Sequence, residues 1–159
     1  MAKGNPKFMR LALREAYKGI HGAEGGPFGA AIVKNGKVIG SGHNRVLKGR
    51  NPTLHAEVCA LDVACRKLKT HLLEGCEIYS TTEPCVMCFA AINWAKIDTI
   101  YFGTAVPDVA RLGFNELTIS NKTLKRLGKS PAKIVSGFMR KECLKLLKSW
   151  KGLPSARTY

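Results

Sequence analysis

The chain has 159 residues, of which 45% are hydrophobic, and it carries a formal net charge of +15. This length suits one domain that buries a core of its own. No apolar run approaches the ~20 residues of a membrane span, and the opening segment leads into no hydrophobic region of a signal peptide, so we expect a cytoplasmic protein that does not associate with membranes.

The first predicted element is a helix over residues 5–22. Asn5 is placed to cap this helix, Pro6 suits its first turn, and glycines follow its end. The apolar residues that we expect to face inward are Phe8, Leu11, Ala12 and Ala16.

An antiparallel hairpin follows, because Asn35 and Gly36 separate two apolar runs in GAAIVKNGKVIGSG. Helices and strands then alternate: a helix over 53–69, a strand over 76–82, a helix over 85–96 and a strand over 98–103. A loop through Asn115, a short helical stretch, a strand near 132–139 and a last helix from Lys141 complete the chain. This order predicts a three-layer α/β/α sandwich whose mixed sheet opens with an antiparallel hairpin and is covered by helices on both faces.

Positive charge is concentrated near the end of the chain. From Asn121 to Tyr159 there are eleven Lys or Arg residues and one acid, Glu142, which gives this segment a charge of +10. Such asymmetry is typical of a phosphate-binding surface. In RKECLKLLKSWK, however, lysines alternate with apolar residues as an amphipathic helix requires, namely Leu144, Leu146, Leu147 and Trp150. We favour a solvated helix face and keep nucleic-acid binding as the alternative.

The run TLHAEVCALDVAC begins a helix with His55 and Glu57 two residues apart. A helix turns by about 100° per residue, so these two side chains point in different directions and do not share one ligand. The pair therefore indicates two separate functions. In the plainer interpretation, Glu57 complements the helix dipole and His55 caps the helix or packs in the core.

TTEPCVMCFAA places Cys85 and Cys88 at the start of the next helix, with a spacing that lets both thiolates bind one ion. Alone, this C-x-x-C also fits a redox pair or half of a structural zinc site. The other cysteines, at 59, 65, 76 and 143, offer no second C-x-x-C. With His55 the set is three ligands, which leaves one position for water as in a catalytic zinc site. We expect one Zn²⁺ per chain, with Glu57 facing the water.

These motifs resemble the cytidine deaminase superfamily, in which a histidine, one residue, a glutamate and Pro-Cys-x-x-Cys form the zinc site. GGPFGAAIVKNGKVIG, NPTLHAEV and TTEPCVMCFAAINWA carry the resemblance, and guanine deaminases and tRNA adenosine deaminases share them. Phe28, Trp94 and GFNE make the chain most similar to bacterial-type guanine deaminases, with tRNA adenosine deaminases next. The resemblance implies the cytidine deaminase-like fold and a hydrolytic deamination.

The resemblance also implies roles for single residues. Glu57 would carry protons, and Glu116 would assist the leaving amine, because Asn115 stands at one of the usual acidic positions. The residues expected to bind or enclose the base are Phe28 by stacking, Asn44 by its amide, Ala56 by its backbone N–H, Trp94 and Tyr159. Plainer roles stay open for four of these residues: packing for Phe28 and Trp94, a turn for Asn44 and a helix-terminal charge for Glu116.

The resemblance predicts the conversion of a small-molecule nucleobase, guanine, to xanthine with release of ammonia. One alternative is A-to-I deamination of adenosine in tRNA, and another is deamination of a different aminated heterocycle such as cytosine or a triazine. A zinc-stabilised binding module without activity is a third alternative. The carboxylate of Glu57 argues against the binding module, because a structural site has no use for it.

Stop signals at Gly152 and Pro154 predict a domain over 1–152 and an extended tail over 153–159. A disordered tail is the plainer expectation. The guanine deaminases that the chain resembles also end in a tyrosine, and their last segment is exchanged between the subunits of a dimer. The resemblance therefore implies a homodimer in which Tyr159 closes the pocket of the neighbouring subunit.

Overall fold

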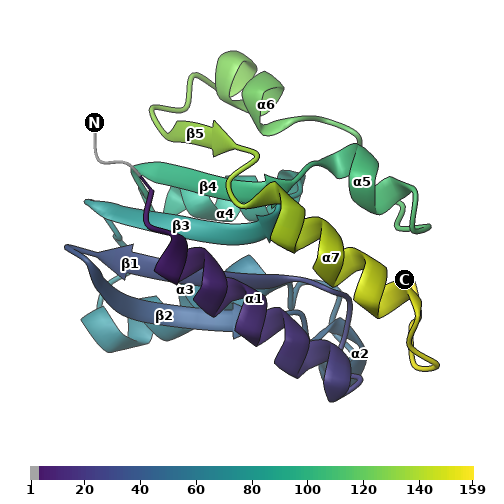
Figure 1. Cartoon of the computed structure of the whole chain (residues 1–159). Helices are drawn as coiled ribbons and strands as arrows, with labels where there is room; N and C mark the ends of the chain where they lie inside the picture. Colours follow the sequence, from purple (N-terminus) through teal and green to yellow (C-terminus); the bar gives the residue numbers. More distant parts are fainter. Residues whose placement is uncertain (1–3) are drawn as a thin grey trace.

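The computed structural model describes residues 4–159. Its centre is a five-stranded sheet in the order β2-β1-β3-β4-β5 (Figure 1). The strands are β1 (Gly29–Lys34), β2 (Lys37–His43), β3 (Cys76–Thr82), β4 (Thr99–Thr104) and β5 (Lys133–Ser136). β1 pairs antiparallel with β2 and β3, whereas β3, β4 and β5 run parallel. The predicted mixed sheet with an opening hairpin is confirmed.

Helices cover both faces of the sheet. One face carries α1 (Pro6–His21) and α7 (Arg140–Lys151), and the other carries α3 (Ala56–Leu68) and α4 (Val86–Trp94) (Figure 1). Three shorter helices lie in the connections: α2 (Val46–Gly49), α5 (Val106–Ala110) and α6 (Asn121–Gly128). This arrangement confirms the three-layer α/β/α sandwich. Within residues 4–159, no helix has the length and apolar character needed to cross a membrane.

The first elements form for the reasons that the sequence suggested. The Asn5 side chain accepts a hydrogen bond from the backbone N–H of Lys7 at 3.0 Å, and Pro6 begins α1. Asn35 and Gly36 have φ angles of 50° and 72°, as the two central residues of a type I′ hairpin turn require. The turn therefore fixes the pairing of β1 with β2.

The core has an aromatic side and an aliphatic side. Under α1, the rings of Tyr79 and Tyr101 stack with centroids 4.5 Å apart, and Phe8 packs on Tyr79. Side chains alternate along a strand, so the fully buried Ile78 and Ile100 face the opposite layer. Burial on both faces holds β3 and β4 firmly, and the chain leaves β3 for α4 only three residues before Cys85.

Some details differ from the sequence predictions. α3 begins at Ala56, later than predicted, because Pro52 and Thr53 form a turn and His55 is the N-cap. The helices α2 and α5 were not predicted, since segments of four and five residues are too short to show an apolar repeat. Leu144 is 38% exposed because Cys143 takes the inward position beside Leu146, Leu147 and Trp150. Leu11 is only partly buried at the edge of the core.

Candidate active site

The predicted metal ligands converge where two helices begin. His55 is the N-cap of α3 and Cys85 is the N-cap of α4, both with extended backbone, while Cys88 lies in the first turn of α4. Cys85 Sγ and His55 Nδ1 are 3.6 Å apart, and the ligand atoms of all three residues lie within 4.8 Å of one another. The positive ends of both helix dipoles point toward this group, which favours thiolate over thiol.

The geometry of the three side chains fits Zn²⁺. An ion with tetrahedral bonds of about 2.0 Å to nitrogen and about 2.3 Å to sulfur separates these two ligand atoms by about 3.5 Å. The distance between His55 Nδ1 and Cys85 Sγ, 3.6 Å, is close to this value. Among residues 4–159 this is the one cluster of three or more metal-ligating side chains at such distances. His55, Cys85 and Cys88 are therefore the residues that would hold a zinc ion.

The side chains of Cys85 and Cys88 interact by a hydrogen bond that shifts their pKa values in opposite directions. A hydrogen bond from the Cys88 thiol, and next one from His55, lowers the pKa of Cys85 to about 4 against the opposing effect of burial. The hydrogen bond to Cys85, and next burial, raise the pKa of the Cys88 thiol. A divalent cation bound by both sulfurs would displace the proton of the Cys88 thiol.

Glu57 lies on the first turn of α3, next to the ligands but not among them. Its side chain is buried, with 6% of the residue exposed, and its carboxylate accepts a hydrogen bond from Ser80 Oγ at 2.9 Å. Burial, and next the negative charge of Cys85, raises the pKa of Glu57. A carboxyl group with a raised pKa that faces a metal site is suited to accept and return protons.

A cavity of about 220 Å³ opens beside the ligands and has mainly apolar and aromatic walls. Phe28 and Phe114 meet edge to face there, with ring centroids 5.1 Å apart. The lining residues are Phe28, Pro52, His55, Cys85, Val86, Met87, Phe114, Asn115, Glu116, Leu117 and Tyr159. A flat aromatic molecule fits between such walls, next to the metal ligands His55 and Cys85.

Glu116 and Asn44 each place an unpaired polar atom near this cavity. Glu116 Oε2 is buried without a hydrogen-bond partner among the described residues, and burial, followed by the charge of Cys85, raises the pKa of Glu116 to about 7. Asn44 is fully buried, and its Oδ1 accepts from the backbone N–H groups of Gly26 and Val46. The Asn44 Nδ2 group has no hydrogen-bond partner in the described chain. Both atoms fit contacts with a polar ligand.

Ala56 is the first residue of α3, and its backbone N–H is among the first-turn donors that no carbonyl of the helix reaches. Trp94 differs from expectation: it is 76% exposed and is not among the residues that line the cavity. The reason is its position, since Trp94 ends α4 while Cys85 and Cys88 lie at the start of the same helix. The prediction that Trp94 lines the pocket is wrong for its own chain.

Tyr159 lines the cavity of its own chain. The tail turns back, with the Ala156 N–H bonded to the Leu153 carbonyl, and the Tyr159 ring meets Phe114 edge to face at 5.4 Å. Although 42% of Tyr159 is exposed, burial of its phenol raises the pKa of that group. The phenol comes near enough to the Asn44 amide for that amide to favour the ionised form. Within one chain the tail therefore reaches the cavity, and exchange of the tail between subunits of a dimer stays a prediction.

Two supporting residues were missed in the sequence. Ser80 holds Glu57 from the end of β3, and no motif marks it because it lies in an ordinary strand run. Glu83, beside Pro84, accepts hydrogen bonds from the N–H groups of Asn121 and Val106, so it ties α6 and α5 to the cysteine turn. The carboxylate directly before Pro84 was the one available signal for this role.

Comparisons with known proteins agree with this site. The family model for the cytidine and deoxycytidylate deaminase zinc-binding region matches residues 3–104. The guanine deaminase of Bacillus subtilis is 40% identical over 69% of this chain and 70% of its own length. The tRNA-specific adenosine deaminase of Aquifex aeolicus is 46% identical over 62% of this chain and 65% of its own length.

The solved structure of a guanine deaminase from Nitrosomonas europaea superposes with a TM-score of 0.86 at 31% identity, covering 96% of this chain and 87% of that one. The predicted resemblance to guanine deaminases and tRNA adenosine deaminases is confirmed. The family model covers more than half of the chain and includes all three metal ligands and Glu57. The chain therefore belongs to the cytidine and deoxycytidylate deaminase family and is a zinc-dependent nucleobase deaminase.

Proposed function

We propose that this enzyme deaminates a free purine base and that guanine is its main substrate, converted with water to xanthine and ammonia. The observation that carries this proposal is the position of the tail: Tyr159 forms part of the wall of a cavity of about 220 Å³. A tail across the mouth suits a small free base better than a nucleotide in an RNA loop. The relatives that are guanine deaminases support the same choice.

The residues around the cavity supply the contacts and the proton transfers. Phe28 and Phe114 provide apolar walls for the purine ring, and Asn44 Nδ2 donates to an acceptor on its edge. A zinc ion held by the three ligands would acidify water beside the base. Glu57 takes a proton from the attacking water and delivers it to ring nitrogen N3 as oxygen adds at C2.

Departure of the amine completes the reaction. The proton of the hydroxyl group now on C2 is transferred to the exocyclic nitrogen, the C2–N bond breaks, and ammonia leaves while the C2 carbonyl of xanthine forms. Glu116 is placed to guide this leaving amine, because its Oε2 is buried without a partner among the described residues and its pKa is raised to about 7. A carboxyl group that titrates near neutral pH both gives and takes protons readily.

Deamination of adenosine in tRNA is the second candidate. The net charge of +15 favours an anionic partner, and relatives with this activity match the chain about as well as the guanine deaminases do. An RNA substrate would have to displace the tail and contact phosphates through surface cations. Such binding weakens steeply as salt rises, whereas binding of a neutral base does not.

The deciding experiment measures ammonia release from guanine, adenine, cytosine, their nucleosides, a triazine and an adenosine-bearing anticodon stem-loop, each at low and high salt. Glu57→Gln is the control for contaminating deaminases. We expect guanine to give the highest kcat/KM with little salt dependence. A faster reaction on the stem-loop that is lost at high salt would assign the enzyme to tRNA.

We also propose that the enzyme acts in the cytoplasm as a homodimer. Trp94, Leu127 and Leu117 expose 76%, 66% and 66% of their surfaces, and they are the most exposed large apolar side chains of the described residues. Apolar surface of this kind is available for contact with a second subunit. Light scattering coupled to gel filtration tests this expectation, and a mass near 17.4 kDa would contradict it.

A further inference from the structure

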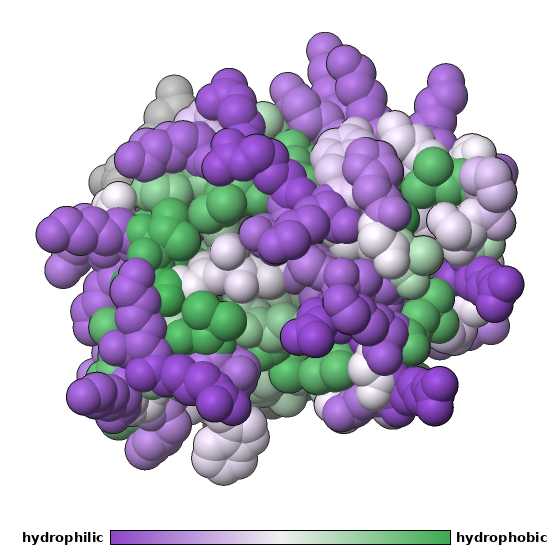
Figure 2. All heavy atoms as spheres, turned by 90° about the horizontal axis from the view of Figure 1, so that it is seen from below, coloured by the Kyte–Doolittle hydropathy of each residue, from purple (hydrophilic) through white to green (hydrophobic). Residues whose placement is uncertain are grey.

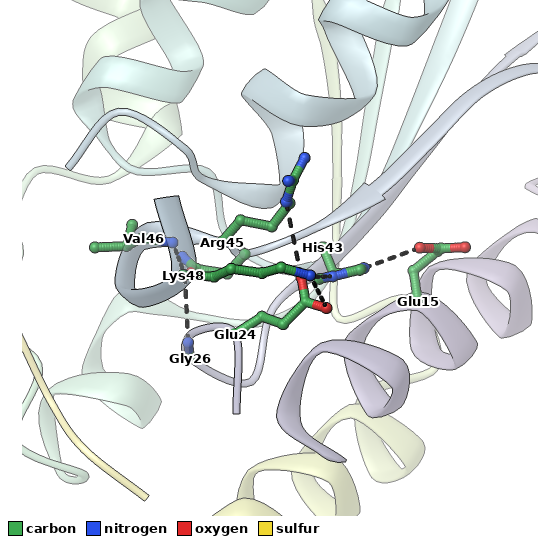
Figure 3. A network of polar contacts seen from close by, with 8 residues as sticks. Glu15, Glu24, Gly26, His43, Arg45, Val46 and Lys48 are labelled. Carbon is green, nitrogen blue, oxygen red and sulfur yellow. Dashed lines mark hydrogen bonds and ion pairs between the residues drawn. The ribbon is translucent and has the colours of Figure 1, made fainter. Parts of the chain in front are cut away.

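His43 lies between two carboxylates in a cluster of polar contacts (Figure 3). Its Nδ1 is 3.1 Å from Glu15 Oε2, and its Nε2 is 3.0 Å from Glu24 Oε2. The residue is buried, with 7% exposed. Each ring nitrogen of His43 is therefore within hydrogen-bond distance of a different carboxylate.

Glu24 is where this cluster meets the loop that precedes β1. Besides His43, its carboxylate contacts Lys48 at 2.9 Å and Arg45 at 3.7 Å, and both of those side chains are about half exposed. The hydrogen bond from His43, followed by that from Lys48, lowers the pKa of Glu24. The Glu24 carbonyl also accepts from the Lys48 backbone N–H at 3.0 Å. His43 is thus the buried partner that fixes Glu24, and with it the chain from 24 to 26.

The loop contacts Asn44 at Gly26, two residues after Glu24. The Gly26 N–H donates to Asn44 Oδ1 at 3.3 Å, and the Val46 N–H donates to the same oxygen at 3.1 Å (Figure 3). A Cβ atom on Gly25 would come within 2.0 Å of that oxygen, so the backbone here approaches the amide closely. Two donors occupy Oδ1, so the Asn44 Nδ2 donor points to the other side of the amide, where it has no hydrogen-bond partner among the described residues. The phenol of Tyr159, which lines the candidate pocket, lies near this amide.

We propose that His43 and Glu24 form a positioning pair for base recognition: through the loop they lock Asn44 as a hydrogen-bond donor toward the pocket. A base that presents a carbonyl oxygen or a ring-nitrogen lone pair at this edge is accepted. A base that presents an amino group there places its own donor opposite the Asn44 donor. No hydrogen bond forms between two donors, so this base is rejected. This proposal rests on the proposed function only in taking Asn44 as a residue that contacts the base.

A merely structural role for the cluster makes a different prediction. Glu15 touches His43 from α1, but no hydrogen bond or ion pair of the described chain links it to the loop. If the cluster only joins α1 to the sheet, losing Glu15 and losing Glu24 have the same consequences. If the cluster positions Asn44, only the loss of Glu24 weakens binding of the base.

The test compares Glu24→Ala with Glu15→Ala, which shorten the same kind of side chain on the two sides of His43. For the base that the wild-type enzyme deaminates best, we expect Glu24→Ala to raise KM about tenfold, the equivalent of one hydrogen bond, with kcat within about twofold. Glu15→Ala should raise KM less than about threefold at a similar melting temperature. Glu24→Gln keeps an acceptor for His43 and should restore most of the affinity.

Equal KM changes in both alanine variants, or a loss confined to kcat, would overturn the proposal. A crystal structure of Glu24→Ala reads the orientation of Asn44 without any substrate: a displaced Gly26 and a rotated amide support the proposal, and an unmoved Asn44 overturns it. If the enzyme proves to act on tRNA, the proposed function fails, yet the same comparison on the stem-loop still tests the pair.

Discussion

At the scale of single residues, Glu57 and Ser80 are the clearest case for mutation. We expect Glu57→Gln to keep the fold and the metal, because an amide of the same shape still accepts from Ser80 Oγ. Turnover should fall by at least about 10²–10⁴-fold, the range for removal of a general acid-base group. Ammonia release together with zinc content checks both parts of this prediction.

Ser80→Ala is the matched control for Glu57→Gln. It removes the hydrogen bond but leaves the carboxylate, so activity should fall much less than in Glu57→Gln. Activity retained in Glu57→Gln would show that another group carries the proton.

Because the pKa of Glu116 is raised, we expect the stability of zinc-free protein to depend on pH. Its pKa in the folded state is about 7, above the value of about 4.3 for an unfolded chain, so the folded protein holds this proton more tightly. The carboxylate therefore destabilises the fold increasingly as pH rises from about 4.3 to 7, and fully above that range. Glu116→Gln should gain about 1–3 kcal/mol over wild type at pH 8 and clearly less at pH 5.

Urea unfolding of both proteins in chelator, at the two pH values, measures that difference. A gain of the same size at pH 5 and pH 8 would mean that Glu116 does not titrate in this range. Adding zinc should reduce the gain, because a nearby cation favours the carboxylate.

The metal ligands were predictable from sequence because spacing along the chain decides which of them lie together. The side chains of His55 and Glu57 point in different directions because the residues are two apart at the start of α3, whereas Cys85 and Cys88 lie in the same turn of α4. Geometry within one turn was therefore sufficient to predict the ligands. Trp94 shows the limit of such reasoning. Whether a side chain at the far end of a helix reaches a pocket depends on how that helix packs, which a single sequence does not reveal.

At the scale of elements, the sheet and its long helices followed from turn and capping residues, while the short connections did not. α5 was predicted as a loop, yet it leads into the segment that carries Phe114 and Glu116. Its position depends on Asp108, which accepts from the Ala105 N–H and from Arg140 of α7. Contacts between elements so distant in sequence leave no local signal.

The tail is the element whose removal is most informative. Deleting residues 154–159 takes away Tyr159 and its contact with Phe114, and it opens one side of the cavity. We expect kcat/KM for the base to fall about tenfold or more, because water enters the pocket, while the melting temperature changes little. Steady-state kinetics and thermal unfolding of the truncated protein check this, and unchanged kcat and KM would show the tail to be idle.

At the scale of the whole molecule, zinc should act as a link between helices. Its ligands come from the starts of α3 and α4, so metal binding stabilises the folded state by mass action, by about 4 kcal/mol at a thousandfold excess over Kd. For a domain of this size, chelation should therefore lower Tm by about 10 °C. Differential scanning calorimetry with and without chelator measures the shift.

Cys85→Ser provides the comparison for that measurement. This variant should bind less than half an equivalent of zinc, lose activity, and melt at the same temperature with or without chelator. A full equivalent of zinc in an active Cys85→Ser protein would contradict the assignment of the site.

The two outer strands of the sheet bear on how the protein behaves in concentrated solution. β5 has only four residues and begins with Lys133, and the pairing of β2 with β1 shifts register between Ile32 and Val33. Short, charged or irregular edges discourage another strand from adding to a sheet. On the face shown in Figure 2, projecting hydrophilic side chains also divide the hydrophobic areas. We expect a protein with these edges and a charge of +15 to resist fibril formation and precipitation during storage.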